Sequence, residues 1–378
     1  MARKPAPKKV KADEPRAAAL PVDAPIALAR VIGQAHALRV LTSAMASDRL
    51  HHAWVFHGPM GVGKMTTALA FAALLLDPTS APGLDGSIAP DPDSPVQHLL
   101  AAGTHPDLHV VRKELARFSA DTDVQKRKQR VIPVDVIREF LIEPAAKTAM
   151  AAPGARATKV FIVDEAELMA DAAQNALLKT LEEPPPGTLV ILVTSRPDRL
   201  LPTIRSRSQM VGFAPLTEAE MRTWIRGRGL EAEGERARWL LEFACGSPGV
   251  YEAADVSGLH DWALRLEPLL AAGDAGRYSP DLGPAMHDLV EGWAEAYVKE
   301  RPQASKEAAN HAGAAWLFRL LAERERRGMR AGRGGGRAER NARAIDAIRR
   351  AETELEANVN ALFVMDHLAA ELAAYEAN

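Results

Sequence analysis

The chain has 378 residues, of which 47% are hydrophobic and 25% charged, as is typical of soluble globular proteins. Its formal net charge is −2, so any contact with nucleic acid must come from a local patch and not from the field of the whole chain. The single cysteine, Cys245, excludes a disulfide framework and a four-cysteine zinc module. The sequence has no bilayer-spanning apolar run and no secretion signal, so we expect a cytoplasmic location.

The first segments of the chain lead up to a buried strand. Residues 1–24 are rich in Lys, Arg, Ala and Pro without hydrophobic periodicity, which predicts a disordered basic tail. An amphipathic pattern predicts a helix over residues 35–48. The apolar run 53–56 then predicts a short buried strand directly before a glycine-rich segment.

That glycine-rich segment, residues 58–66, has the context of a phosphate-binding P-loop. It follows a predicted strand and precedes a predicted helix over residues 67–76. Its glycines let the backbone turn N–H groups toward an anion, and the helix N-terminus adds a positive dipole end. The candidate nucleotide-binding residues here are Gly58, Gly61, Gly63, Lys64 and Thr66.

The residue after the P-loop lysine breaks the pattern. A Ser or Thr hydroxyl is expected there because it binds Mg²⁺, but the chain has Met65. Thr66 lies about 100° further round the helix and cannot simply replace that hydroxyl. The segment therefore predicts phosphate binding better than it predicts metal-dependent hydrolysis.

A second candidate site follows the next strands. Proline and glycine predict a loop over residues 77–103, followed by a strand over 108–111 and a helix over 134–150. The apolar strand 159–163 ends in Asp164 and Glu165, where a Walker B motif holds Mg²⁺ and polarises the attacking water.

Further strands complete a predicted α/β fold. We expect a helix over 171–183, a strand over 188–193 and a short strand over 210–213. Near-continuous apolar strands alternating with helices predict a parallel sheet covered on both faces. Ser195, just after the strand predicted over 188–193, is a further candidate nucleotide-binding residue.

Several motifs resemble the clamp-loader branch of the AAA+ ATPases. They are Ile32-Gly33-Gln34, Leu50-His51-His52-Ala53, the Asn175 to Pro185 stretch and Thr203-Ile204-Arg205-Ser206-Arg207. The resemblance covers roughly residues 28 to 215 and implies an AAA+ core over 25–214, a helical lid over 215–258 and an all-α collar over 259–378.

The resemblance also implies partners and roles. It places the chain in a hetero-pentamer with gamma/tau and delta subunits that loads the sliding clamp of DNA polymerase III on primer-template DNA. It makes Arg207 an arginine finger, which reaches the ATP site of a neighbouring subunit. It implies ATP and Mg²⁺ as ligands, bound without turnover, and the cysteine count predicts no zinc.

Two subunit types remain open. Three features favour the non-hydrolysing delta-prime type. They are Met65, Gly249 in place of a nucleotide-sensing arginine, and the residue sequence of the Thr203–Arg207 motif. Lys64, Asp164 and Glu165 favour the ATP-hydrolysing gamma/tau motor. We expect a subunit of a DNA-directed DNA polymerase complex without ATPase activity of its own.

The C-terminal third is predicted to be helical. Helices are expected over 217–228, 233–245, 247–255, 262–270, 285–299, 308–327 and 342–375. The arginine- and glycine-rich stretch 324–343 is expected to be a flexible loop, which either contacts DNA or is a solvated insert. Together with the basic tail it supports a third hypothesis, a nucleic-acid-binding adaptor.

Overall fold

The fold is taken from a computed structural model of the chain. It describes residues 22–47, 50–82, 88–125, 130–150, 154–230, 233–275, 277–301, 304–331 and 335–374. Most of the predicted basic tail lies outside these ranges, as does the centre of the arginine- and glycine-rich stretch. The described residues divide into two compact units: those within 1–58, 63–127 and 131–213 form the first, and those within 59–62, 128–130 and 214–378 form the second.

A five-stranded parallel sheet is the centre of the first unit. Its strands lie in the order β4-β5-β6-β1-β7, and every pairing between them is parallel. Their bounds are β1 Ala53–His57, β4 Leu108–Val111, β5 Lys159–Val163, β6 Thr188–Thr194 and β7 Gln209–Gly212. The predicted parallel sheet is therefore confirmed, with β1 next to β6 and two positions away from β5.

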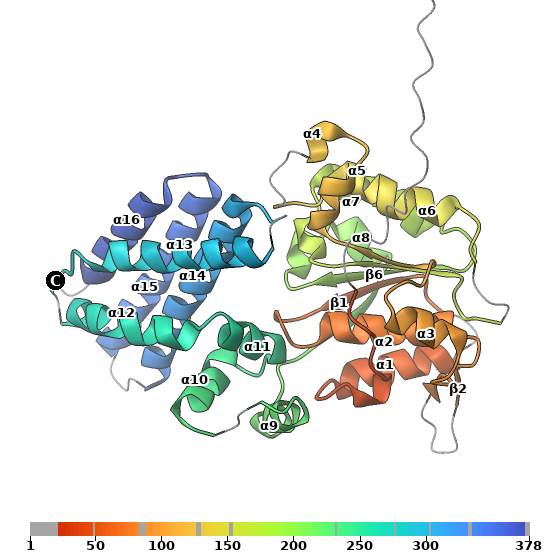
Figure 1. Ribbon diagram of the computed structural model, residues 1–378, viewed down its shortest axis with the longest axis horizontal. Coiled ribbons are helices and arrows are strands. Elements are labelled where there is room, and N and C mark those ends of the chain that lie inside the picture. The colour runs from red at the N-terminus through yellow and green to blue at the C-terminus, as the bar shows by residue number, and fades with distance from the viewer. Residues whose placement is uncertain are drawn as a thin grey trace, which may run out of the picture. The chain divides into compact units, whose positions relative to one another are not determined.

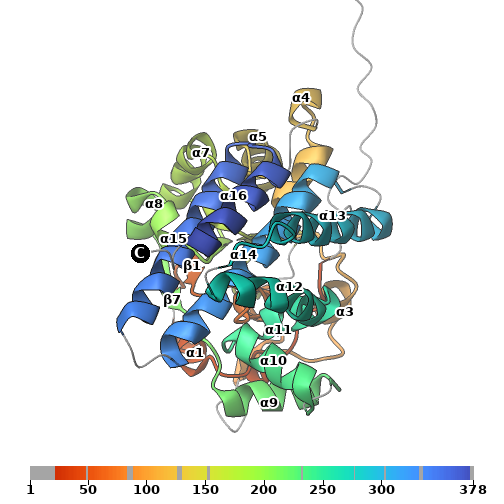
Figure 2. The same ribbon diagram turned by 90° about the vertical axis from the view of Figure 1, so that its left-hand side faces the viewer.

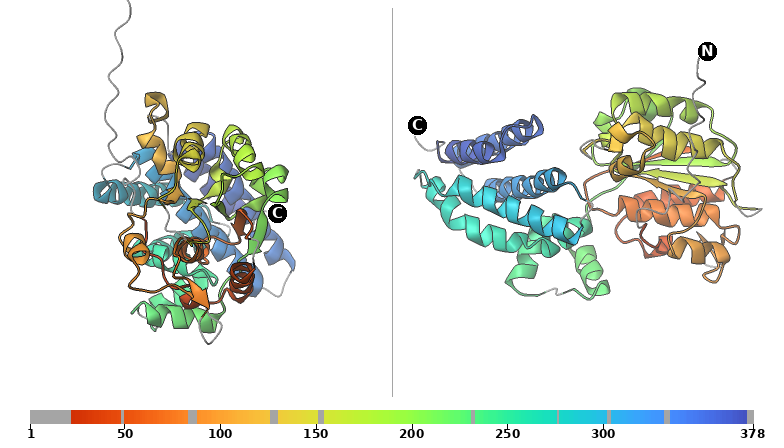
Figure 3. Two further views of the ribbon diagram at one scale, coloured as in Figure 1. Left: turned by 90° about the vertical axis from the view of Figure 1, so that its right-hand side faces the viewer. Right: turned by 45° about the horizontal axis from the view of Figure 1, so that its top comes forward.

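Helices cover both faces of this sheet (Figure 1). On one face lie α1 (Ala35–Ala46), α2 (Lys64–Leu76) and α3 (Pro95–Ala101), and on the other α5 (Val134–Ile137), α6 (Glu143–Ala146) and α7 (Asp171–Glu182). The right-hand view of Figure 3 shows the sheet between the two layers. The shorter elements are η1 Leu28–Arg30, β2 Ala81–Pro82, β3 Ile88–Ala89, η2 Lys113–Phe118, α4 Thr122–Gln125, η3 Arg138–Ile142, η4 Ala166–Leu168, η5 Pro197–Arg199 and α8 Pro202–Ser206.

The apolar strands are buried because both of their faces are covered. All residues of β5 and β6 are buried, as continuous apolar runs in a parallel sheet require. On one face, Val55, Phe161 and Val190 pack in a single cluster with the apolar side of α7. The sheet thus holds its carboxyl edge, where the candidate site lies, on a rigid base.

Two predicted elements of the first unit differ from the structure. The predicted loop over 77–103 contains α3, whose N-terminus is capped by the Ser94 hydroxyl accepting from the Val96 N–H, with Pro95 in the first turn. Proline therefore begins a helix here. The helix predicted over 134–150 ends at Ala146 and contains a π-helical stretch, η3.

The second unit is helical. Its helices are α9 Glu218–Gly227, α10 Glu235–Ala244, α11 Pro248–Val256, α12 Leu259–Asp274, α13 Leu282–Glu300, α14 Lys306–Ala331, α15 Gly335–Glu356 and α16 Ala361–Ala374. Thr217 and Glu220 form the capping box at the start of α9 that their spacing indicates. Figure 2 shows α13 to α16 packed beside one another.

The C-terminal region corrects two predictions. The helix expected over 342–375 is two helices, separated by residues 357–360, where Asn358 has a left-handed φ of 64°. Apart from residues 332–334, which lie outside the described ranges, the stretch 324–343 is helical and not a loop. The predicted boundary between lid and collar stays a prediction. Within the described ranges, no helix combines the length and apolar character needed to span a bilayer.

Candidate nucleotide-binding site

Three strands bring the candidate residues to one edge of the sheet. In a parallel α/β sheet, ligands bind beyond the carboxyl ends of the strands. The P-loop follows β1, Ser195 follows β6, and Asp164 and Glu165 follow β5. Because β6 lies between β1 and β5, the structure brings these predicted residues to neighbouring positions along that edge.

The P-loop has the backbone that its glycines predict. Gly58, Gly61 and Gly63 have φ values of 145°, 77° and 100°, which only glycine adopts without strain. Gly63 is the N-cap of α2, so the loop leads directly into a helix N-terminus. The Lys64 ammonium donates to the Gly58 carbonyl oxygen at 2.7 Å. The loop therefore has the backbone turn that its glycines predict, and its lysine bonds to the loop backbone.

Burial makes the charge on Lys64 unfavourable. The residue is 7% exposed, and burial lowers the pKa of its ammonium from 10.5 to about 8, although Glu167 and Asp164 oppose this shift. A group that is held at an energetic cost in the folded chain is typical of a functional site. An anion bound in the loop would restore the favourable environment for this charge.

Replacing Lys64 by methionine is therefore expected to stabilise the folded chain near pH 7. The lowered pKa means that the folded state disfavours the proton that the unfolded state carries, at a cost of up to about 3 kcal/mol. This penalty is full below pH 8 and disappears as the pH rises toward 10.5. Urea unfolding at pH 7 and pH 10 should show a stabilisation of Lys64→Met that fades at the higher pH.

A lysine on the surface provides the matched control for this prediction. Lys147 has an exposed side chain, so Lys147→Met should change stability by less than about 0.5 kcal/mol at either pH. A Lys64→Met variant that is less stable than the wild type at pH 7 would contradict the conclusion that the Lys64 charge destabilises the folded chain.

No hydroxyl takes the Mg²⁺-binding position after Lys64. Met65 holds that position, and the side chain of Thr66 is exposed. Thr67 is fully buried and its hydroxyl donates to the Gly63 carbonyl at 2.8 Å. The structure therefore offers no nearby substitute for the missing ligand within this turn of α2.

Both Walker B carboxylates face cations of the same chain. Arg112 Nε lies 3.5 Å from Asp164 Oδ2, and Lys113 Nζ lies 2.6 Å from Glu165 Oε2. Burial raises the pKa of Asp164 despite the nearby Arg112. Burial lowers the pKa of Lys113, but Glu165 more than offsets this and leaves it above its usual value. Sequence reasoning missed the two cations, although both directly follow a predicted strand.

Ser195 is held by a second residue that sequence reasoning missed. Its hydroxyl donates to Glu167 Oε1 at 2.6 Å, and its backbone N–H donates to the same oxygen at 3.1 Å. Burial raises the pKa of Glu167, but hydrogen bonds, including those from Ser195, lower it by more. The pKa therefore stays below its usual value. Ser195 is thus close to the other candidate residues but already occupied by an internal partner.

The oxygen donors present do not fit Mg²⁺ well. This ion needs a nearly octahedral set of oxygen ligands and usually takes one or two carboxylates. Asp164 and Glu165 are engaged by Arg112 and Lys113, and Met65 provides no hydroxyl. Within the described parts of the chain, no group of three or more His, Cys, Asp or Glu side chains is arranged to hold a metal ion.

Gly249 contacts the tip of the P-loop, and both belong to the second unit. The Gly249 N–H donates to the Gly61 carbonyl at 2.8 Å, and a Cβ at position 249 would lie 3.0 Å from the Gly61 Cα. A side chain at position 249 would force the loop to move. The arginine expected here in a motor subunit would therefore require a small shift of the P-loop backbone.

Arg207 lies at the opposite edge of the sheet from the P-loop. It follows α8 and precedes β7, so it is at the amino end of a strand that runs parallel to β1. Its guanidinium contacts Glu182 at 2.9 Å and is partly exposed. Arg207 is therefore not positioned to serve the P-loop of its own chain.

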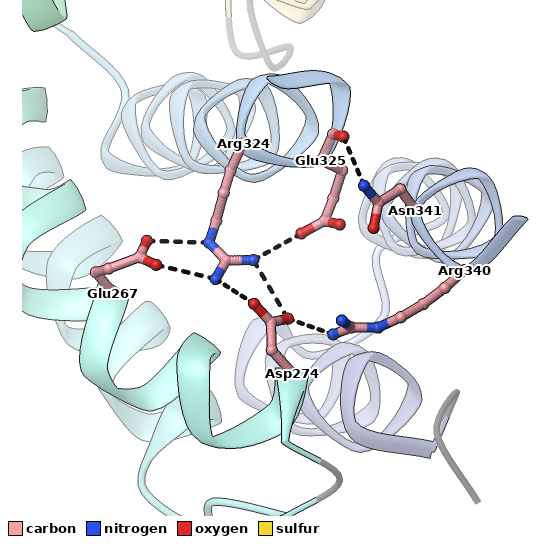
Figure 4. A network of polar contacts seen from close by, with 6 residues as sticks. All are labelled: Glu267, Asp274, Arg324, Glu325, Arg340 and Asn341. Atoms are coloured by element: carbon pink, nitrogen blue, oxygen red, sulfur yellow. Dashed lines mark hydrogen bonds and ion pairs between the residues drawn. The ribbon is translucent and has the colours of Figure 1, made fainter. Parts of the chain in front are cut away.

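Most arginines of the 324–343 stretch are paired with acids of the second unit. Arg324 contacts Glu267, Asp274 and Glu325, and Arg340 also contacts Asp274 (Figure 4). The remaining described ion pairs are Arg326–Glu323, Arg327–Glu242, Arg330–Glu323 and Arg343–Glu339. These pairs leave less positive charge for a phosphate backbone than a solvated loop would.

The strand order, the P-loop and the acids after β5 define the first unit as an α/β P-loop fold of the AAA+ type. Comparison with known proteins is more specific. The model of the family described as "DNA polymerase III, delta subunit" matches residues 33–217. Over these residues, just under half of the chain, the sequence is similar to the delta-prime clamp-loader family.

Curated relatives of two kinds match the same region. The chain is 35% identical over 197 residues to DNA polymerase III subunit delta' of Pseudomonas aeruginosa, which covers 52% of the chain and 53% of that protein. It is 33% identical over 210 residues to subunit gamma/tau of Mycobacterium bovis, covering 56% of the chain and 32% of the relative. The chain thus spans about a third to a half of the length of these relatives.

Solved structures show lower similarity. A gamma subunit-related protein of DNA polymerase III from Thermotoga maritima has 16% sequence identity and a TM-score of 0.43, and the match covers 89% of the chain and 98% of that structure.

Proposed function

We propose that the chain is a delta-prime-type subunit of the DNA polymerase III clamp loader. It braces a hetero-pentamer with gamma/tau and delta subunits, which acts on the sliding clamp and on primer-template DNA. It does not hydrolyse ATP, and it presents Arg207 to the ATP site of a neighbouring subunit. The relatives named delta' and gamma/tau support the clamp-loader role.

The position of Arg207 carries this proposal. It lies at the edge of the sheet opposite the P-loop of its own chain, where it is accessible to another subunit. An arginine finger supplied in trans stabilises the charge that develops on the transferred phosphoryl group. The exposed pair with Glu182 is worth at most about 1 kcal/mol, so Arg207 can leave it on assembly.

Substitution of Arg207 tests the proposal in the reconstituted loader. Arg207→Ala should lower DNA-stimulated ATP turnover at the site it serves by roughly 10³-fold or more, because a finger contributes that much to phosphoryl transfer. Steady-state phosphate release measures this loss. Arg207→Lys should rescue it only partly, because lysine cannot reproduce the planar guanidinium.

The neighbouring Arg205 is the matched control. It is exposed and lies on the same helix, so Arg205→Ala should leave ATP turnover close to that of the wild type. Equal turnover in the Arg207→Ala and wild-type loaders, with the pentamer intact on gel filtration, would refute the role of Arg207.

The gamma/tau-type motor is the second candidate. The similarity to a gamma/tau protein and the presence of Lys64, Asp164 and Glu165 favour it. It requires the purified chain to hydrolyse ATP by itself, with the activity lost in Lys64→Ala. The delta-prime proposal requires no such turnover, whether or not ATP binds weakly through Lys64.

A further inference from the structure

The structure holds two cations beside the acids at which a P-loop protein normally places its metal. Arg112 and Lys113 directly follow β4, and Asp164 and Glu165 directly follow β5. These strands are parallel neighbours, and Val111 pairs with Val163 at their ends. The register therefore sets Arg112 beside Asp164 and Lys113 beside Glu165.

The backbone fixes this arrangement beyond the last paired residues. The Asp164 N–H donates to the Val111 carbonyl at 3.0 Å, which extends the ladder between the strands by one bond. Glu165 then adopts a left-handed φ of 49°, which is unusual for a residue other than glycine. The two acids are thus held by the sheet and a strained turn, and not by the ion pairs alone.

The charges at this edge are balanced without a metal. Lys64, Arg112 and Lys113 provide three positive charges, and Asp164, Glu165 and Glu167 provide three negative charges. A dication needs an excess of negative oxygen donors and must compete with cations already in contact with the two acids. A polyanion at the loop instead meets the Lys64 ammonium and the N-terminus of α2.

We propose that Arg112 and Lys113 take the place of the metal at this site, so that the P-loop binds a polyphosphate in a metal-free form. This inference concerns the same P-loop as the proposed function and rests on its phosphate-binding character, but not on the role of Arg207. Arg112 and Lys113 are positioning residues, which hold the two carboxylates away from a metal. The ligand class is a nucleoside di- or triphosphate without Mg²⁺.

Binding of Mn²⁺ tests the inference on the full chain without any ATPase assay. The free ion is counted by electron paramagnetic resonance in titrations of four proteins. These are the wild type, Asp164→Asn, the double variant Arg112→Gln/Lys113→Gln, and the same double variant combined with Asp164→Asn. We expect no binding that depends on Asp164 in the wild type, so its titration should match that of Asp164→Asn.

The double variant should gain a metal site. Removing two positive charges next to the acids should strengthen Mn²⁺ binding by at least about tenfold, and the added Asp164→Asn change should abolish the gain. The matched control is Arg222→Gln/Arg228→Gln, which removes two charges from exposed ion pairs on α9 and just after it. This control should leave Mn²⁺ binding unchanged.

Two results would overturn the inference. One is Mn²⁺ binding by the wild type that is lost in Asp164→Asn, a result that these two proteins alone can give. The other is a folded double variant, verified by circular dichroism, that gains no Mn²⁺ affinity.

A second measurement uses the wild type alone. The affinity for ATP, measured by displacement of a fluorescent nucleotide, should be the same in Mg²⁺ and in EDTA. Affinity that needs Mg²⁺ would contradict the inference, as would the absence of any ATP binding. Neither result bears on Arg207, whose role is decided in the reconstituted loader.

Discussion

Replacing Arg324 by methionine is expected to lower the free energy of unfolding of the second unit by roughly 2 kcal/mol near neutral pH, between the values for exposed and for buried ion pairs, because the network is partly buried. Arg324 contacts Glu267 at 3.0 Å, Asp274 at 2.8 Å and Glu325 at 3.0 Å. Methionine keeps much of the volume but leaves three acids facing one another, with only Arg340 on Asp274 to offset them.

The pH dependence of this effect has a definite sign. Burial raises the pKa of Asp274, but hydrogen bonds from Arg324 and Arg340 more than offset this and leave it below its usual value. The stabilisation from the Asp274 carboxylate is therefore present above its ordinary pKa and is lost as the pH falls through the lowered value. In Arg324→Met the facing acids gain protons more readily, so the deficit should shrink as the pH is lowered.

Native-state hydrogen exchange of peptides from α12 and α14 provides the measurement, because a protein with two compact units need not unfold in one step. Arg326→Met is the matched control on the same helix. Arg326 is well exposed and has one 3.7 Å contact with Glu323, so its loss should cost less than about 0.5 kcal/mol. Equal effects of the two substitutions would contradict the argument.

This network explains why the sequence predicts a flexible loop over 324–343 where the described residues are helical. Glycines and closely spaced arginines indicate a solvated loop when only neighbouring residues are considered. The acids that neutralise Arg324 lie more than one helix away, at Glu267 and Asp274, and only the packed bundle brings them together. Non-local charge pairing of this kind leaves no local pattern.

The sheet and the P-loop were predictable because their signals are local. Continuous apolar runs mark β1, β5 and β6, and the glycines before Lys64 mark the turn. The pairing of Arg112 and Lys113 with the Walker B acids needs one more fact, that β4 and β5 are neighbours. The sequence shows that two cations follow one strand and two acids follow the next, but it does not give the strand order.

The break after α15 is another feature that the sequence pattern does not predict. Asn358 tolerates the left-handed conformation that ends this helix, but apolar residues continue through the break in the sequence, at Val359, Leu362 and Phe363. Periodicity therefore predicted one helix where the chain forms two. Asn358 and Asn360 alone do not identify such a turn without the packing around them.

Replacing Gly58 by alanine is expected to destabilise the first unit by more than roughly 3 kcal/mol, because backbone strain and overpacking add together. Gly58 has a φ of 145°, and a Cβ there would lie 2.2 Å from the Phe213 carbonyl oxygen and 3.0 Å from its carbonyl carbon. The Phe213 N–H also donates to the His57 carbonyl at 2.8 Å. The clash is with backbone, so either the P-loop or the end of β7 must move.

Gly63→Ala separates strain from clash. Gly63 has a φ of 100°, but no atom lies within 4 Å of the Cβ position, so its replacement should cost only the backbone term of about 1 to 3 kcal/mol. Gly227→Ala has neither problem and should change stability little. Hydrogen exchange of peptides from β1 and β7 should show faster opening in Gly58→Ala than in Gly63→Ala. If the two variants open equally fast, the close approach of Gly58 to Phe213 does not hold the P-loop against β7.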